Sequence, residues 1–447
     1  MRKKCSLSAS LSILVMPLLL IFSCLMAQPA AASAPSIEWQ KCLGGSDVDA
    51  AVSIQITSDG GCIIAGSTAS NDGDVSRNND TGKLADAWIV KLNPKGSIEW
   101  QKCFDPSGSY TVSSIWQTND GGYITAGSTR SKNIERHHGK VDAWIMKLNP
   151  KGNIEWEKCF GGSSDDHASP IQQTDDGGYI FAGLTISNDG DVSGHHGIGI
   201  PDAWVVKLDS SGTIDWQKCY GGSGIEWVRS IQQTSDGGYI FAGLTYSNDG
   251  DVTGFHSSSK KIGDPDVWVM KINSTGNIEW QKCLGGSEND EANSIRQTSD
   301  GGFIVAGKTR SDDGDVSGNH GQDAWVVKLN PKGNIEWQKC LGGSWRDEAY
   351  SIQQTNDGGF IIAGETMSDD GDVSGNHGDV DAWVVKLNPK GDIEWQKCLG
   401  GSENDVARSI HQMSDGGYIV AGSTSSNDGD VSGNHGKSDA WIVKLAP

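Results

Sequence analysis

The sequence has few apolar residues and few basic residues for its length. Only 36% of its 447 residues are hydrophobic, and 36 Lys and Arg residues stand against 57 Asp and Glu residues. The low apolar content argues against a helical bundle or a membrane transporter. An excess of acids repels phosphate backbones and anionic lipids, which makes nucleic acid an unsuitable partner. Beyond residue 34 no apolar run is long enough to predict a transmembrane span.

Residues 1–34 have the pattern of a signal peptide. A basic stretch (2–4) precedes an apolar run (11–26), and small residues at 30–34 offer A-x-A cleavage sites. The pattern predicts an exported protein, secreted or at the cell surface, whose mature chain is residues 35–447. A lipoprotein is the alternative, because Ile21-Phe22-Ser23-Cys24 loosely fits the motif for acylation, and anchoring through Cys24 stays open.

Three short motifs each occur seven times in the mature chain, at a spacing of about 56–64 residues. The IEWQKC-type motif begins at Ile37, Ile98, Ile154, Ile214, Ile278, Ile335 and Ile393. The DAW-type motif begins at Asp86, Asp142, Asp202, Asp266, Asp323, Asp381 and Asp439. DGG begins at Asp59, Asp120, Asp176, Asp236, Asp300, Asp357 and Asp415. The repeats therefore leave no room for a second domain.

Each repeat has the pattern of four short strands. In the sixth repeat, 351–355 and 360–366 flank the turn NDGG, and 382–387 and 393–398 flank NPKGD. Glycine supplies the positive φ that such tight hairpins require, and the strands are rich in β-branched and aromatic residues. Apolar side chains on both strand faces predict sheets that are each packed between two neighbours. The fold class is therefore all-β, a propeller of seven four-stranded blades.

The two ends of the mature chain are complementary. Residues 37–42 form a fourth-strand motif at the beginning, whereas the chain stops after a third-strand motif at 439–445. We expect the N-terminal strand to become the outer strand of the last blade, which removes the free edge of an open ring.

The consensus resembles a known group of repeats. The segment AWVVKLNPKGNIEWQKCLGGS (324–344), followed by D-x-A-x-S-I and DGGFIIAG, is similar to the SBBP repeats of secreted and surface proteins of bacteria and archaea. The resemblance covers nearly all of 37–445. It implies an exported or surface propeller scaffold and no particular chemistry.

Alternating strand directions place two sets of connections on one face of the ring, here called the loop face. These are the connections from the fourth strand to the next blade and the acidic loops from the second to the third strand. The DGG and NPKG turns lie on the opposite face, here called the turn face.

The acidic loops predict calcium sites. DGDVSG or DGDVTG recurs in five repeats, and D-x-D-x-[ST]-G is the opening half of a calcium loop, in which alternate oxygens converge around the ion. Asp-Gly turns without a metal are the alternative interpretation. In the last two repeats a further acid falls where a closing ligand would lie. The predicted ligands are Asp189, Asp191, Asp249, Asp251, Asp313, Asp315, Asp370, Asp372, Asp381, Asp428, Asp430 and Asp439.

Residues that break the repeat are the better candidates for ligand binding, because symmetry does not require them. Trp227, Trp345 and Arg346 are predicted to lie on the loop face, where aromatic side chains suit stacking on a sugar or contact with a partner. Trp116 and the inserted loop at 255–264 are further irregular positions.

These observations favour a non-catalytic exported propeller, expected to be a monomer, that binds a protein or a glycan at its acidic loop face. The alternative is a glycan-active hydrolase or lyase with its site at the central mouth of that face. No nucleophile–base signature is present, and the acids near the mouth recur with the blades, whereas an enzyme needs an asymmetric pair. Calcium is the only cofactor that the sequence suggests.

Overall fold

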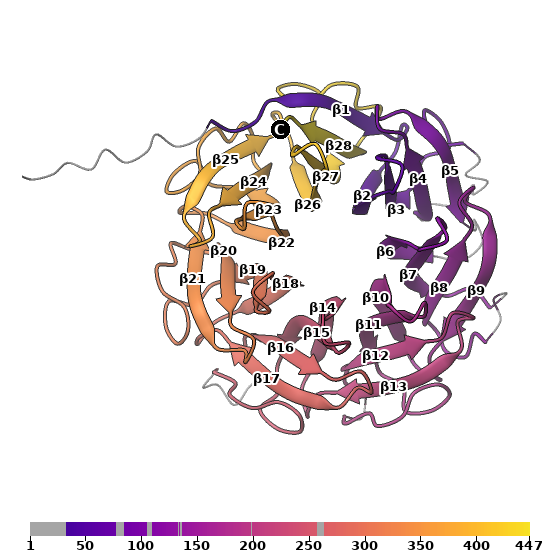
Figure 1. Ribbon diagram of the computed structural model, residues 1–447. Helices are drawn as coiled ribbons and strands as arrows, with labels where there is room; N and C mark the ends of the chain where they lie inside the picture. Colours follow the sequence, from indigo (N-terminus) through magenta and orange to yellow (C-terminus); the bar gives the residue numbers. More distant parts are fainter. Residues whose placement is uncertain are drawn as a thin grey trace, which may run out of the picture. The chain divides into compact units, whose positions relative to one another are not determined.

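The structure is a computed structural model that describes residues 33–76, 85–104, 110–132, 134, 136–197, 199–256 and 263–447. The predicted leader, with Cys24, lies outside the described residues except for its last two positions. Residues Ser33–Pro447 form one compact unit. Seven four-stranded antiparallel sheets stand around a central axis (Figure 1), which confirms the predicted seven-bladed β-propeller. Among the described residues, no helix has the length and hydropathy to cross a membrane.

Within each blade the four strands follow one another in chain order from the axis outward, and β1 (Ile37–Leu43) takes the outermost place in the last blade. The innermost strands are β2 (Asp49–Ile56), β6 (Tyr110–Gln117), β10 (Asp166–Gln173), β14 (Glu226–Gln233), β18 (Asp290–Gln297), β22 (Asp347–Gln354) and β26 (Asp405–Gln412). The second strands are β3 (Cys62–Thr68), β7 (Tyr123–Thr129), β11 (Tyr179–Thr185), β15 (Tyr239–Thr245), β19 (Phe303–Thr309), β23 (Phe360–Thr366) and β27 (Tyr418–Thr424).

The third and fourth strands complete the blades. The third strands are β4 (Asp86–Leu92), β8 (Asp142–Leu148), β12 (Asp202–Leu208), β16 (Asp266–Ile272), β20 (Asp323–Leu329), β24 (Asp381–Leu387) and β28 (Asp439–Leu445). The outer strands are β5 (Ile98–Phe104), β9 (Ile154–Phe160), β13 (Ile214–Tyr220), β17 (Ile278–Leu284), β21 (Ile335–Leu341), β25 (Ile393–Leu399) and β1 (Ile37–Leu43). In the sixth repeat the innermost strand begins at Asp347, four residues before the predicted start at Ser351.

The core lies between the blades. Almost all residues of the second and third strands are buried, since apolar side chains on both faces pack against the two neighbouring sheets. Trp383 is 1% exposed and donates its Nε1–H to Gln396 Oε1 at 2.9 Å, so the buried indole has a partner on the outer strand. The equivalent bond recurs in other blades, for example from Trp325 to Gln338 at 2.8 Å.

Seven buried lysines stabilise the turn face. Lys386 is 3% exposed, and its Nζ lies 2.9 Å from Asp357 and 2.8 Å from Glu394. Partial burial of Asp357 opposes ionisation, but hydrogen bonds from Thr355 and Lys386 outweigh it and lower the pKa of Asp357 to about 2. A lowered folded-state pKa means that this carboxylate stabilises the fold above its usual pKa of 3.8, and the contribution is lost as the pH falls toward 2.

The N-terminal strand closes the ring as predicted. β1 pairs antiparallel with β28, with Cys42 opposite Trp441, in the sheet β1-β28-β27-β26. Trp441 donates to Gln40 Oε1 at 2.8 Å, which repeats the bond of the other blades across the two chain ends. Lys444, the buried lysine of the last blade, likewise forms an ion pair with Glu38 of β1, at 2.7 Å.

Removing β1 is therefore expected to destabilise the ring. A chain that begins at Gly44 leaves the edge of β28 unpaired and the Trp441 and Lys444 side chains without their β1 partners. We expect the melting temperature to fall by roughly 5 °C or more and the protein to associate through the exposed edge. Differential scanning calorimetry and gel filtration at two protein concentrations measure both effects. A chain that begins at Ser36 is the control, and equal stability of the two chains would contradict this account of closure.

Candidate ligand-binding site in the axial channel

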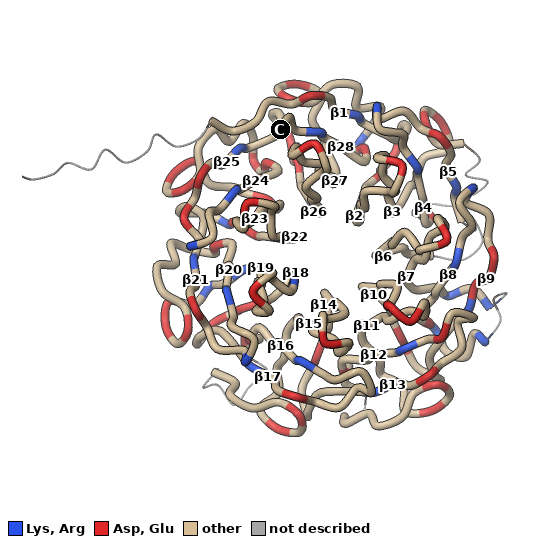
Figure 2. Tube along the Cα trace, in the orientation of Figure 1, with Lys and Arg blue, Asp and Glu red and all other residues tan. Residues whose placement is uncertain are grey.

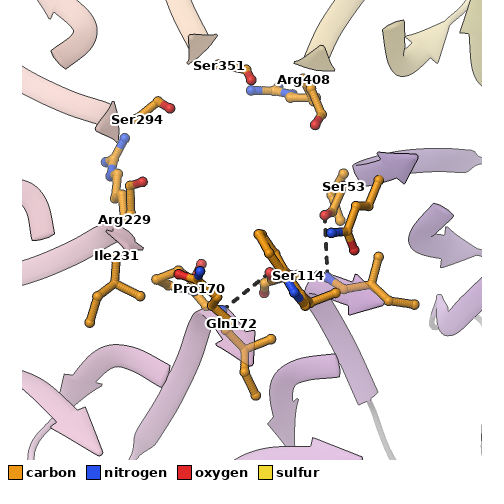
Figure 3. Close-up of a pocket in the computed structure, with 18 of the residues that line it drawn as sticks. Ser53, Ser114, Pro170, Gln172, Arg229, Ile231, Ser294, Ser351 and Arg408 are labelled. Atoms are coloured by element: carbon orange, nitrogen blue, oxygen red, sulfur yellow. Dashed lines mark hydrogen bonds between the residues drawn. The ribbon is translucent and has the colours of Figure 1, made fainter. Parts of the chain in front are cut away.

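Each innermost strand has one unpaired edge toward the axis, and side chains from the neighbouring blade complete it. Ser53 Oγ accepts the Ile115 N–H at 3.4 Å, and Ser114 Oγ accepts the Ile171 N–H at 3.4 Å (dashed lines in Figure 3). Ser230 accepts in the same way from Ile295 at 3.2 Å. These serines satisfy backbone donors that no strand can reach.

A second layer of side chains does the same nearer the turn face. Gln232 Oε1 accepts the Gln297 N–H at 2.7 Å, and Gln353 Oε1 accepts the Gln412 N–H at 3.0 Å. The equivalent glutamines in the other blades that keep the repeat are Gln55 and Gln172. At this position three blades carry another residue instead: Trp116, Arg296 and His411.

A β-bulge in the innermost strands turns a further residue toward the channel. In the sixth blade the pairing shifts between Ala349 and Ser351, so Tyr350 is the extra residue. The equivalent residues that line the channel are Val52, Ser113, Ser169, Arg229, Asn293, Tyr350 and Arg408. Small residues occupy three adjacent blades and large polar residues occupy the other four. The side chains that line the channel are thus arranged asymmetrically, although the seven blades share one strand order.

The four large bulge residues interact with one another and with nearby acids. Arg229 donates to Asn293 Oδ1 at 2.6 Å and pairs with Glu291 at 2.8 Å. Asn293 donates in turn to Glu348 Oε1 at 3.0 Å. The Arg408 guanidinium lies 4.0 Å from the centre of the Tyr350 ring. Figure 3 shows Arg229 and Arg408 on two of the strands that surround the opening.

Acids that do not recur with the repeat lie at the loop-face end of this arc. Glu348 and Glu365 are 3% and 6% exposed. Arg346 pairs with Glu348 at 3.2 Å and with Glu365 at 2.7 Å. Lys308 lies 3.5 Å from both Glu291 and Glu348. All three glutamates are therefore occupied by cations of the protein itself.

Of the residues predicted to bind a ligand, Trp345 is the most exposed. It lies in the connection from β21 to β22 with 66% of its surface exposed. Trp227 is 39% exposed and belongs to β14 rather than to a loop, because the innermost strands begin earlier than predicted. Its ring lies 5.0 Å from the Arg229 guanidinium. Ion pairs with Glu348 and Glu365 hold the Arg346 side chain in one orientation.

The predicted calcium loops fold onto the glycine corner of their own blade. Asp370 Oδ1 accepts the Ser344 N–H at 2.7 Å, and the Asp372 N–H donates to the Gly342 carbonyl at 2.9 Å. The first acids of the other four loops accept from the equivalent serine at 2.7–2.8 Å: Asp189, Asp249, Asp313 and Asp428. The second acids, Asp191, Asp251, Asp315 and Asp430, donate their N–H to the corner glycine at 2.8–2.9 Å.

No group of three or more His, Cys, Asp or Glu side chains in the described part of the chain is arranged to hold a metal ion. The predicted closing acids, Asp381 and Asp439, are buried at the start of the third strand. Asp381 Oδ2 accepts from the backbone and ring nitrogens of His377 at 2.9 and 2.8 Å, and Asp439 accepts from the His435 ring at 2.6 Å. Calcium binding by these loops stays a prediction from the sequence.

Buried carboxyl groups meet at the junctions between blades. Burial raises the pKa of Asp266 to about 6, and the neighbouring Asp290 adds to the rise. Burial also raises the pKa of Glu226 to about 7, and Asp202 of the preceding blade adds to this rise. These recurring acids accept hydrogen bonds within their own blades, as Asp405 does from Gly401 at 2.8 Å and Ser426 at 2.7 Å. Their role is structural.

Sequence reasoning missed the charged arc of the channel. Arg229, Asn293, Tyr350 and Arg408 are irregular positions, so the same criterion that selected Trp345 applies to them. They lie within strands, however, where the repeat motif alone does not indicate that a bulge turns them toward the axis. Comparing the seven repeats position by position would have found them.

The fold and the site define a seven-bladed β-propeller with an asymmetric, polar axial channel. No family model matches the chain. The chain is 27% identical over 271 residues to the regulatory protein FlaEY of Caulobacter vibrioides; the match covers 56% of this chain and 26% of FlaEY. The chain therefore spans about a quarter of the length of that relative.

Two solved structures are also similar. Sqt1 from Chaetomium thermophilum is 9% identical with a TM-score of 0.44, and the match covers 92% of this chain and 100% of Sqt1. A puromycin hydrolase is 10% identical with a TM-score of 0.49, over 88% of this chain and 53% of the hydrolase. At these values neither structure carries an argument about the activity of this chain.

The raised pKa of Glu226 predicts a pH-dependent stability. Because the folded state holds this proton more tightly, the stabilisation is full below pH 4.5 and is lost as the pH rises through about 7. The shift in the pKa of Glu226 corresponds to a change of about 3 kcal/mol in the free energy of unfolding across this pH range. The substitution Glu226→Gln is expected to flatten the decline of the melting temperature between pH 4.5 and 8. The exposed Glu403→Gln serves as the control, and an unchanged pH profile in Glu226→Gln would contradict the assignment.

The calcium prediction has a direct test. After chelation, calorimetric titration with calcium measures the number of sites, and Asp370→Ala combined with Asp372→Ala is expected to remove one of them. Both substitutions also break hydrogen bonds to the Gly342–Ser344 corner, so a lower melting temperature alone does not indicate calcium. The absence of any binding heat in the unmodified chain would leave these loops as Asp-Gly turns.

Proposed function

We propose that this chain is an exported, non-catalytic β-propeller that binds a protein or a glycan partner at its acidic loop face. The observation that carries the proposal is the exposed Trp345, which lies beside an arginine that two buried glutamates orient. A rigid aromatic ring next to an oriented cation is a combination that binding surfaces favour, because little conformational freedom is lost on contact.

A second aromatic region on the same face supports the proposal. A small cavity of about 180 Å³ is lined by Ile200, Pro201, Ile225 and Tyr246. Tyr246 donates its N–H to the Ile225 carbonyl at 2.9 Å, and Trp227 lies two residues further along β14. The cavity and the half-exposed Trp227 ring thus add apolar groups to the same face of the ring.

Export and surface location rest on the leader pattern of residues 1–34 and on the resemblance to SBBP repeats. Whether Cys24 anchors the chain or the leader is simply removed depends on which cleavage motif is used. The similarity to FlaEY, a regulatory protein, is in keeping with a chain that acts by binding.

The asymmetric glutamates give the hydrolase or lyase alternative its one specific observation. Glu291, Glu348 and Glu365 lie together at the mouth of the loop face, as a glycan-active enzyme requires. Ion pairs with Arg229, Lys308 and Arg346 occupy them, which favours an orienting role. Cleavage of a bound glycan that Glu348→Gln abolishes would establish the alternative.

The proposed function predicts a binding defect without a folding defect. Trp345→Ala is expected to weaken partner binding by roughly tenfold or more while the melting temperature stays unchanged, because the ring is largely exposed. Glycan arrays and capture from cell-envelope extracts identify the partner, and the affinities of both forms for it are then compared. Glu403→Ala is the matched control, since Glu403 is the exposed residue at the same corner of the next blade. Equal affinity in Trp345→Ala would refute this assignment.

A further inference from the structure

The axial channel contains positive charge that the rest of the molecule does not neutralise. Arg296 donates Nη1 hydrogen bonds to Ser230 Oγ at 3.1 Å and to the Ile295 carbonyl at 2.8 Å. Arg408 stacks on Tyr350. Among the described residues neither arginine has a carboxylate within ion-pair distance, whereas Arg229 pairs with Glu291. Two unpaired arginines are unexpected in a chain with so many more acids than bases.

Below the loop-face mouth, the described wall of the channel has no acidic residues. Its narrow middle part, of about 170 Å³, is lined by Arg229, Arg296, Arg408, His411, the serine layer and the bulge residues. A wider chamber of about 770 Å³ opens toward the turn face between Ser235, Ser299 and Gly301. Among the described residues that line these two spaces there is no Asp or Glu. An anion that enters meets cationic, amide, hydroxyl, aromatic and aliphatic groups and, among these residues, no carboxylate.

Three residues in the chamber depart from the repeat, and two of them cost the fold a hydrogen bond. His411 hydrogen-bonds to the backbone of Ile54 in the next blade. Trp116, Arg296 and His411 line both spaces and stand at the position of the glutamines that accept a neighbour's backbone N–H. A guanidinium and an indole have no acceptor, so they cannot replace that bond. These substitutions give up structural contacts and place chemically distinct groups in a cavity. Such a combination indicates a ligand site.

The three groups are spread around the channel, and one or two blades separate each from the next. Arg296 is on β18 and His411 is on β26, with only the blade of Gln353 between them, and Trp116 follows across the blade of Gln55. Arg296 and His411 line the same two spaces. Burial and the charge of Arg296 lower the pKa of His411 to about 4, so the imidazole is neutral at neutral pH.

We propose that the chamber at the turn face binds a sugar acid, with its carboxylate held by Arg296. The planar guanidinium matches a carboxylate through two parallel N–H donors. The glutamine amides and serine hydroxyls supply hydrogen-bond partners for sugar hydroxyls, and the Trp116 ring offers a face on which a pyranose stacks. The volume suits one or two sugar residues. The ligand is either a free sugar acid or the end of an acidic polysaccharide, which share this chemistry.

Calorimetric titration of the chain 35–447, which contains all 28 strands, tests the proposal. The probes are D-galacturonate, its trimer, neutral D-galactose and acetate. We expect saturable 1:1 binding of galacturonate that galactose and acetate do not match. Tighter binding of the trimer would identify a polysaccharide end as the ligand, and tighter binding of the monomer would identify a free sugar acid.

Arg296→Gln is the decisive variant, because glutamine is the residue that the repeat places there. It is expected to weaken galacturonate binding by roughly tenfold or more, with the melting temperature unchanged or raised. His411→Gln is a second variant of the same design. Arg310→Gln, on the loop face, is the control for loss of one positive charge.

Three results would overturn the proposal: no saturable binding of galacturonate or its trimer at millimolar concentration, equal binding of galactose, or binding that Arg296→Gln leaves intact. Equal binding of acetate would overturn the sugar part. The outcome is independent of the loop-face proposal, because Trp345→Ala is expected to leave galacturonate binding unchanged.

Discussion

The unpaired edge of the innermost strands is the constraint on which this ring depends. A propeller blade ends at the axis with backbone N–H groups that no further strand can reach, and a layer of serines and a layer of glutamines accept them across to the next blade. Each blade thus completes its neighbour around the axis, as the apolar faces do farther out. The same bonds explain why serine precedes isoleucine at this point in six of the seven repeats and why glutamine follows it in four.

Residues that recur in the blades stabilise the fold, whereas the candidate binding residues are those that differ from blade to blade. The buried lysines, the Trp–Gln bonds and the carboxyl pairs at the blade junctions recur around the ring, and each has its partners within the fold. The two sets of acids respond oppositely to pH, since the Lys-paired acids stabilise the fold when ionised and the buried junction acids when protonated. Residues that break the repeat are not required by this recurring framework, although several of them also make contacts between blades.

The exceptions fall into two groups at opposite ends of the channel. On the loop face, Trp345 and Trp227 are exposed beside ion-paired glutamates, and that surface suits a partner held by aromatic contact. Toward the turn face, Arg296 and His411 line a chamber without acids, which suits a small anion. Between them the bulge residues form a polar arc over four blades, while the bulge positions of the other three blades carry the smaller side chains Val52, Ser113 and Ser169.

The sequence by itself determined the number of blades, their four-stranded composition and the closure by the N-terminal strand, because a repeat that cannot bury its faces alone must stack on copies of itself. It also indicated that irregular residues matter, as with Trp345. Only the tertiary structure decided which irregular residues meet. A bulge changes the face on which Tyr350 and Arg408 lie, and the ring brings Arg229 and Asn293, which are 64 residues apart, within hydrogen-bond distance. The channel is made of such contacts between blades, and a repeat pattern read one blade at a time does not contain them.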